Sequence, residues 1–129
     1  MLVDDNKIDN FFHERVIRKN NAAKIILTKD SAFEAIEHLR KGTAVVQPDV
    51  IFLDINMPGM NGWEFIEHYK SLENGLQNSM IVVMLSTSDN PDDRELAKTH
   101  QILSDFKTKP LTKEMLEEVL LKYSLNRAH

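Results

Sequence analysis

Five polar side chains of this sequence each lie at the end of a segment that could form a strand, four of them after a short apolar run: Asp4, Asp5, Asp54, Ser86 and Lys109. Taken singly, each is an ordinary turn residue or surface charge. If the apolar runs are parallel strands of one sheet, however, their carboxyl ends meet at one edge, where ligands gather. The joint pattern therefore predicts that three carboxylates, a hydroxyl and an ammonium group converge at that edge.

Three neighbouring carboxylates raise one another's pKa unless a cation neutralises them. Mg²⁺ suits a site made of a few carboxylates, a backbone carbonyl and several waters. Such a metal would also prepare Asp54 to attack an activated phosphoryl group, because the charge on the phosphoryl oxygens must be offset. Lys109 and Ser86 can each contact a phosphoryl oxygen. Thr87 is an alternative to Ser86, because a wholly apolar strand does not fix the register by periodicity. We therefore predict a phosphoryl-transfer site with Asp54 as the acceptor.

The elements that must position these residues are visible in the hydrophobic pattern. Short apolar runs alternate with longer amphipathic stretches, which is typical of β-α units around a parallel sheet. We expect strands at Leu2–Val3, Lys24–Thr28, Val50–Leu53, Ile81–Leu85 and within Ile102–Lys107. Helical spacing or helix start signals follow each strand: Ile8, Phe11, Phe12, Arg15, Val16 and Lys19; Ser31 through Leu39 with a stop at Gly42; Trp63 through Tyr69; Pro91 onwards; and Leu111 through Tyr123.

The composition is that of one globular domain over residues 1–129, with 42% hydrophobic and 28% charged residues. The formal net charge of -4 gives no electrostatic reason to expect nucleic acid or an anionic membrane as a partner. No cysteine is present, which excludes disulfides and thiol chemistry. We see no signal peptide, and the longest apolar run, Met80 to Leu85, is too short to cross a membrane. We therefore expect a cytoplasmic protein. No output domain is present, so the chain is either a stand-alone domain or a fragment, and we favour a stand-alone domain because the tail from Asn126 to His129 has no linker composition.

In its order of residues the chain resembles the receiver domain of two-component response regulators over essentially its whole length. Asp4 and Asp5 match the acidic pair of that family, and the segment DINMPGMNG from Asp54 matches its DxxMPxxxG pattern around the phosphoacceptor. Further matches in order and spacing are Ser86, the aromatic switch position Phe106, and the pair Lys109-Pro110. The resemblance implies a flavodoxin-like, doubly wound α/β fold, with a five-stranded parallel sheet of order 2-1-3-4-5 and helices on both faces.

The resemblance also implies roles for single residues. Asp5, Asp54 and the backbone carbonyl of Asn56 would be direct ligands of Mg²⁺, and Asp4 would act mostly through water. The phosphoryl donor would be a histidine kinase or a histidine phosphotransfer protein. Phosphorylation would then move Phe106, which lacks the hydroxyl that a tyrosine would bring. The face of the fourth helix, fifth strand and fifth helix would carry the output to a downstream protein, and a homodimer through that face is a further expectation.

Two other functions compete with a phosphorylated switch. A phosphatase of the haloacid-dehalogenase type also forms an aspartyl phosphate, but it needs a second aspartate two residues after the nucleophile, where this chain has Asn56. We therefore expect no enzyme beyond self-catalysed phosphoryl transfer and slow autodephosphorylation. A pseudo-receiver that only binds partners would be expected to lose the acidic pair or the lysine, and both are present. Nucleotide binding has no support, since neither a GxGxxG nor a GxxxxGKS/T segment occurs.

Five histidines remain to be explained: His13, His38, His68, His100 and His129. No two of them have the spacing of a metal-binding motif. We expect all five to titrate at the surface of helices or in the tail, with the phosphoryl-donating histidine supplied by a partner protein.

Overall fold

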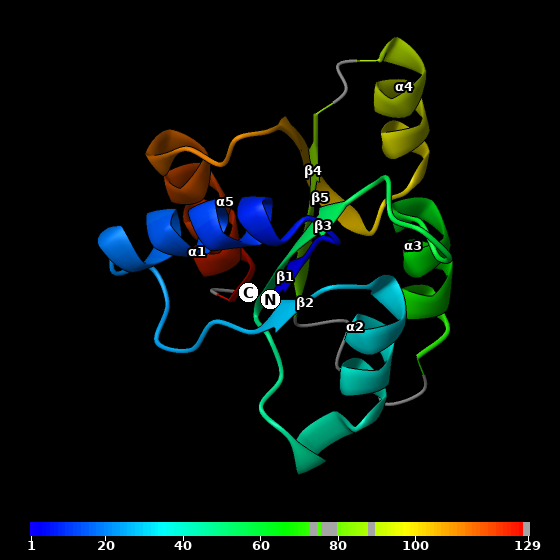
Figure 1. Cartoon of the computed structure of the whole chain (residues 1–129), viewed down its shortest axis with the longest axis horizontal. Helices are drawn as coiled ribbons and strands as arrows, with labels where there is room; N and C mark the ends of the chain where they lie inside the picture. The colour runs from blue at the N-terminus through cyan, green and yellow to red at the C-terminus, as the bar shows by residue number, and fades with distance from the viewer. Residues whose placement is uncertain (73–74, 76–79, 88–89, 128–129) are drawn as a thin grey trace.

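A parallel sheet forms the centre of the protein (Figure 1). The computed structural model describes residues 1–72, 75, 80–87 and 90–127. In this described part the sheet has five strands: β1 (Leu2–Val3), β2 (Thr28–Lys29), β3 (Val50–Asp54), β4 (Ile81–Ser86) and β5 (Leu103–Thr108). Their order is β2-β1-β3-β4-β5. The structure therefore confirms the α/β fold and the strand order that the resemblance implied.

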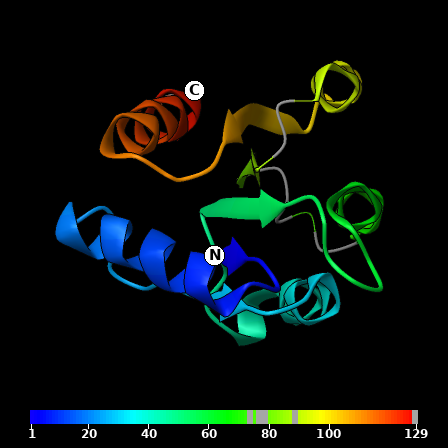
Figure 2. The same ribbon diagram turned by 45° about the horizontal axis from the view of Figure 1, so that its top comes forward.

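Helices cover both faces of the sheet: α1 (Lys7–Lys19), α2 (Ala32–Arg40), α3 (Gly62–Lys70), α4 (Pro91–Thr99) and α5 (Lys113–Arg127), with a short 3-10 turn η1 (Gly42–Ala44). α1 and α5 lie on one face, whereas α2, α3 and α4 lie on the other (Figure 2). Each face of the sheet therefore has its own apolar layer. Within the described ranges, no helix has both the length and the apolar character needed to cross a membrane.

The two central strands, β3 and β4, are apolar on both faces, as helix-covered parallel strands must be. Along β4, Ile81, Val83 and Leu85 pack into the layer beneath α1 and α5, whereas Val82 and Met84 pack beneath α2 and α3. A buried polar group without a partner in these strands would cost about 1–3 kcal/mol of stability. Polar side chains in β3 and β4 are therefore confined to the last residue of each strand, Asp54 and Ser86.

The second strand is shorter and begins later than predicted. The sequence pattern placed it at Lys24–Thr28, but β2 spans only Thr28–Lys29. A parallel strand needs a neighbour that supplies hydrogen bonds, and the two residues of β1 pair with Thr28 and Lys29. The apolar residues 25–27 instead line a cavity whose wall also includes Met1 and Tyr123. The sequence pattern identified a segment that could form a strand, but the length of β2 is limited by the two residues of β1 with which it can pair.

The buried face of α1 is not the one that its apolar residues suggest. Phe11 and Phe12, which contributed to the helical spacing, are 60% and 53% exposed. The buried residues of the helix are Asn10, His13 and Ile17. The prediction that every histidine titrates at the surface is therefore wrong for His13. The inward face of α1 is polar near its start because that end of the helix lies beside the acidic pair.

The turn after β3 fixes where Asp54 lies. The amide of Gly62 donates to the carbonyl oxygen of Ile55 at 2.7 Å. A Cβ atom on Gly62 would lie 2.6 Å from the backbone oxygen of Asp54, so a larger residue would force α3 away. α3 itself starts with a capping box, in which the side chains of Asn61 and Glu64 each accept from the other's amide. The peptide that follows Asp54 is thus held tightly against the start of α3.

Candidate functional site

The residues predicted to do chemistry converge at the carboxyl end of the sheet. Asp54 and Ser86 are the last residues of β3 and β4, and Asp4 and Lys109 directly follow β1 and β5. Asp4 and Lys109 are 105 positions apart in the sequence, yet their side chains form a hydrogen bond. The topology of the sheet therefore brings together groups that the sequence spreads over most of the chain.

Three carboxylates form a cluster at this edge. One carboxylate oxygen each of Asp4, Asp5 and Asp54 lies within 4.8 Å of the others. Asp4 and Asp54 are buried, whereas Asp5 is exposed. Mg²⁺ binds one or two protein carboxylates at a time and keeps several of its waters, so it needs a site that opens to solvent on one side. The donor set and its partial exposure therefore fit Mg²⁺. Asn56 lies two residues beyond β3, in the exposed turn.

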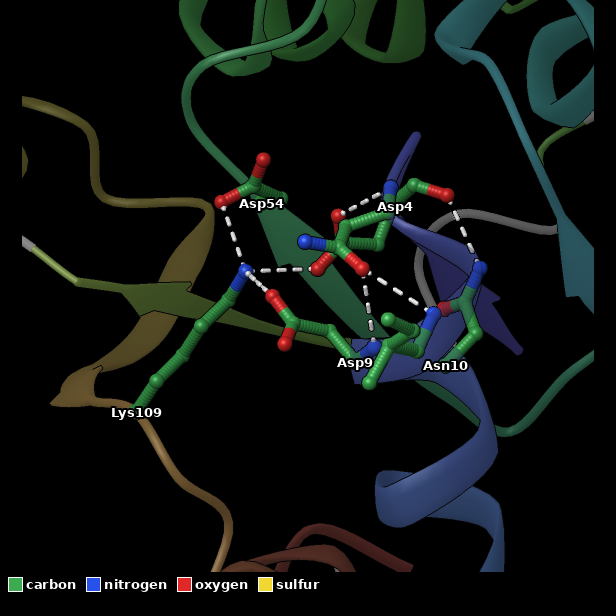
Figure 3. A network of polar contacts seen from close by, with 7 residues as sticks. Asp4, Asp9, Asn10, Asp54 and Lys109 are labelled. Atoms are coloured by element: carbon green, nitrogen blue, oxygen red, sulfur yellow. Dashed lines mark hydrogen bonds and ion pairs between the residues drawn. The ribbon is translucent and has the colours of Figure 1, made fainter.

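The ammonium group of Lys109 lies among carboxylates (Figure 3). Its Nζ atom is 2.6 Å from Oδ2 of Asp4, 2.9 Å from Oδ2 of Asp9 and 3.2 Å from Oδ1 of Asp54. The lysine side chain is only 8% exposed. A charge so far removed from water depends on its ionic partners, since the loss of hydration must be offset by them. Lys109 therefore joins α1 to the ends of β1 and β3.

Burial raises the pKa of Asp54 to about 6, and the charge of Asp4 adds to this shift. Lys109 acts in the opposite direction. Burial and the charge of Asp4 together outweigh this effect of Lys109, so the pKa of Asp54 remains raised. A further cation entering the cluster would lower the pKa of Asp54 and keep the carboxylate ionised, which a nucleophile requires.

Burial alone would lower the pKa of Lys109, but its hydrogen bonds to Asp4 and Asp9 outweigh burial and raise it. The lysine is therefore a permanent cation of the site. Its backbone is fixed as well, because the amide of Lys109 donates to the carbonyl oxygen of Ser86 at 2.7 Å. The end of β5 is thereby tied to the end of β4.

The two candidate hydroxyls differ in burial. Ser86 is 1% exposed at the end of β4, and it pairs in the sheet with Thr108, directly before Lys109. Thr87 is exposed. A buried hydroxyl at the inner edge of the site is better held in one orientation than an exposed one, so the geometry favours Ser86.

Three residues of α1 belong to this site although the sequence pattern did not identify them. Asp9 contacts Lys109, and Nδ2 of Asn10 donates to the backbone oxygen of Asp4 at 2.8 Å. His13 is buried, and burial together with the charge of Lys109 lowers its pKa. The sequence feature that could have identified them is the position of His13, four residues after Asp9 and three after Asn10, which places all three on one side of a helix that starts beside the acidic pair.

Replacing Asp54 by Asn should stabilise the protein at alkaline pH when a chelator keeps the site free of metal. The pKa of Asp54 in the folded protein, about 6, lies above the ordinary value of 3.8. Ionisation of Asp54 therefore destabilises the fold increasingly as the pH rises between these two values. The variant should gain up to about 3 kcal/mol in free energy of unfolding at about pH 8, and nothing below the ordinary pKa.

Urea unfolding of both proteins over this pH range measures the difference. Asp49→Asn, which removes an exposed carboxylate just before the same strand, is the control and should show no such gain. Equal stability of wild type and Asp54→Asn at alkaline pH would mean that burial and the charge of Asp4 do not raise the pKa of Asp54 in the folded protein.

Residues 1–121 match the family described as response regulator receiver domain. Protein PilG of Pseudomonas aeruginosa is 32% identical over 117 residues, which cover 90% of this chain and 79% of PilG. The sensor histidine kinase GacS of Pseudomonas protegens is 24% identical over 125 residues, which cover 96% of this chain but only 13% of the kinase. This chain thus spans most of one relative and a small part of another.

Solved structures agree with the sequence matches. A two component response regulator from Cytophaga hutchinsonii superposes with a TM-score of 0.89 and 34% identity, covering 96% of this chain and 94% of that one. A response regulator receiver protein from Dyadobacter fermentans gives a TM-score of 0.85 and 34% identity, covering 95% and 94%. The match to the family model, the sequence relatives and the shared fold lead to one conclusion: the chain belongs to the response regulator receiver domains of two-component phosphorelay systems.

Proposed function

We propose that this chain is a switch controlled by phosphorylation, in which Asp54 accepts a phosphoryl group from a histidine kinase or a histidine phosphotransfer protein in the cytoplasm. We further propose that the reaction depends on Mg²⁺. The observation that carries the proposal is the environment of Asp54. This carboxylate ends a wholly apolar strand, is buried beside two other carboxylates, and lies 3.2 Å from a buried ammonium group.

The reaction moves one phosphoryl group. An oxygen of the Asp54 carboxylate forms a bond to phosphorus, and the bond from phosphorus to the donor's imidazole nitrogen breaks, leaving its electron pair on the imidazole. Bound Mg²⁺ would offset the charge of the phosphoryl oxygens. Asp5, Asp54 and the carbonyl of Asn56 would hold the ion directly, and Asp4 through water. The exposure of Asp5 supports this assignment, because an ion that keeps its waters needs a ligand on the solvent side.

Lys109 and Ser86 are the groups that we assign to the phosphoryl oxygens. Since Nζ of Lys109 lies 3.2 Å from Oδ1 of Asp54, a phosphoryl group on that carboxylate would be within its reach. Ser86 is preferred to Thr87 because its side chain is buried at the same edge. The donor would approach from the side of the exposed Asp5.

The two competing functions have less support. An enzyme of the haloacid-dehalogenase type needs a titratable acid-base group at position 56, and the amide of Asn56 cannot take that role. A pseudo-receiver has no need of a lysine buried among carboxylates, an arrangement that is difficult to stabilise for structure alone. Lys109 is nevertheless retained, in contact with both Asp4 and Asp54.

The output should leave through the face formed by α4, β5 and α5. In the described part of the chain α4 has no buried residue, so little packing holds it in place. Arg94 of α4 lies 5.3 Å from the centre of the Phe106 ring and donates to the hydroxyl of Thr108 at 3.2 Å. Phe106 is half-buried and can turn inwards only by leaving that guanidinium. Because it has no hydroxyl, its burial has no polar desolvation cost. A homodimer would use the same face.

Incubation with a small phosphodonor such as acetyl phosphate should add one phosphoryl mass to the wild type and none to Asp54→Asn. A chelator should abolish the reaction, because the charge on the phosphoryl oxygens would no longer be offset. Mass spectrometry of the intact protein measures both effects. Asp49→Asn, just before the same strand, should be labelled like the wild type. Labelling of Asp54→Asn, or labelling that a chelator leaves undiminished, would contradict the assignment.

Asp5→Asn should weaken Mg²⁺ binding more than Asp4→Asn. Loss of a contact relayed through water typically reduces metal affinity by about tenfold to a hundredfold, and loss of a direct ligand should exceed this. Calorimetric titration of Mg²⁺ into each variant gives the order. Asp4 also binds Lys109, so urea unfolding in chelator should accompany the titration to show that each variant is folded. If Asp4→Asn binds Mg²⁺ less well than Asp5→Asn, the assignment of direct and indirect ligands is wrong.

A phosphate mimic such as beryllofluoride should shift backbone NMR signals along α4 and β5 as well as around Asp54. The reason is that Lys109 and Ser86 would be drawn to the mimic, and Phe106 would turn away from Arg94. Asp54→Asn, which cannot bind the mimic, is the control. Shifts confined to the Asp54 and Asp4-Asp5 loops, with residues 90–109 unchanged, would mean that Phe106 is a fixed core residue and that the domain does not switch by this route.

A further inference from the structure

Lys109 has three carboxylate partners, and they are not equivalent. Asp4 and Asp54 belong to the cluster whose oxygens could hold a metal ion, whereas Asp9 does not. Asp9 lies in the first turn of α1, and its carboxylate is 2.9 Å from the ammonium nitrogen (Figure 3). Asp9 is therefore a partner that Lys109 can keep when a metal ion occupies the others.

This difference matters because an ammonium group and a divalent cation compete for the same carboxylates. Nζ of Lys109 lies 2.6 Å from Asp4 and 3.2 Å from Asp54. A metal ion that draws on the charge of these two residues repels the ammonium and takes away its partners. A lysine that is only 8% exposed cannot regain full hydration in place of them. Without another anion nearby, loss of these ion pairs would oppose metal binding.

We propose that Asp9 is a positioning residue that holds the ammonium of Lys109 while Mg²⁺ occupies the acidic cluster, and that it raises the affinity for Mg²⁺ by this means. The inference rests on the Mg²⁺ dependence contained in the proposed function. Asp9 acts through Lys109 and is not itself a ligand. Its carboxylate draws the ammonium towards α1, so that Asp4 and Asp54 become available to the metal and its waters.

The local structure supports this role. The backbone amide of Asp9 donates to Oδ1 of the cap residue Asn6 at 3.2 Å, which fixes the first turn of α1. The Asp9 side chain is 31% exposed, so its charge is stabilised by water as well as by Lys109. An acidic residue in the first turn also favours the helix dipole. That effect explains its place on the helix but not its contact with a lysine 100 positions away.

His13 does not take over the role of a second cation. It is buried on the same helix, and burial together with the charge of Lys109 lowers its pKa, which favours the neutral ring. Asn10 is neutral as well and donates to the backbone of Asp4. Among the described residues of α1 that face the cluster, Asp9 is thus the charged one, and its carboxylate is the group that can hold Lys109.

The test is a double-mutant cycle in which calorimetry measures Mg²⁺ affinity, without any phosphoryl transfer. Asp9→Asn should weaken binding by about tenfold, as loss of an outer-shell contact usually does. In the Lys109→Met background, where no ammonium remains to be held, Asp9→Asn should have no more effect than the control. The control is Glu14→Gln, which removes the same charge from the same helix, where Glu14 pairs with Arg18.

Asp9→Glu adds a second readout, because it keeps the carboxylate and should restore most of the affinity lost in Asp9→Asn. This pair tests the need for a carboxylate at position 9 even if the Lys109→Met protein does not fold, and Lys109→Arg, which keeps a cation, then serves as the second background. Urea unfolding in chelator reports on the folding of each variant. Three results would overturn the inference: unchanged affinity in Asp9→Asn, an equal loss in Asp9→Glu, or the same loss with and without Lys109, which would make Asp9 a ligand. Absence of Mg²⁺ binding in the wild type would instead overturn the metal dependence of the proposed function, and this inference with it.

Discussion

One buried ammonium group contacts three carboxylates and cannot neutralise all of them. The site depends on this excess of negative over positive charge. Lys109 contacts Asp4, Asp9 and Asp54, and Asp5 lies close to two of these. A simple ion pair would lower the pKa of its carboxyl group, yet burial, with the charge of Asp4, raises the pKa of Asp54 to about 6. The cluster therefore carries excess negative charge that a proton, a metal ion or water must relieve.

The sheet makes such a cluster possible because it confines the charge to one edge. β3 and β4 are buried along their length, so polar groups are excluded from their interior and collected at their carboxyl ends. The absence of a side chain at Gly62 lets α3 begin against the backbone of Asp54. On the other side, α1 turns Asn10 and His13 inwards and leaves aromatic side chains in water. The side of α1 that faces the carboxylates is therefore polar, and the apolar side chains of Phe11 and Phe12 remain exposed.

These two features explain what the sequence predicted well and what it did not. Residues such as Asp54 were identifiable because they follow long apolar runs, and parallel strands place such ends together. Asp9 was not, because its role depends on a contact with Lys109 across 100 positions of the chain, which no local pattern contains. The position of β2 was wrong for a related reason: a strand is defined by its neighbour as well as by its own residues. The spacing of apolar residues predicted α1 but not which of its faces is buried. Asn10 and His13 face the carboxylates, and Phe11 therefore points to solvent.

The same edge of the sheet also connects the acidic cluster to α4 through a few contacts. The amide of Lys109 is bonded to the carbonyl of Ser86, and Ser86 pairs with Thr108 in the sheet. The hydroxyl of Thr108 in turn accepts from Arg94, the residue that covers Phe106. Each link is a single contact, so a displacement of Lys109 would act directly on the ends of β4 and β5. Since α4 has no buried residue among those described, moving it should require less free energy than moving the other elements that these contacts join. If Asp54 is phosphorylated as we propose, the change of charge would reach the contact between α4 and β5 through these links, and this contact is the element that we expect to change.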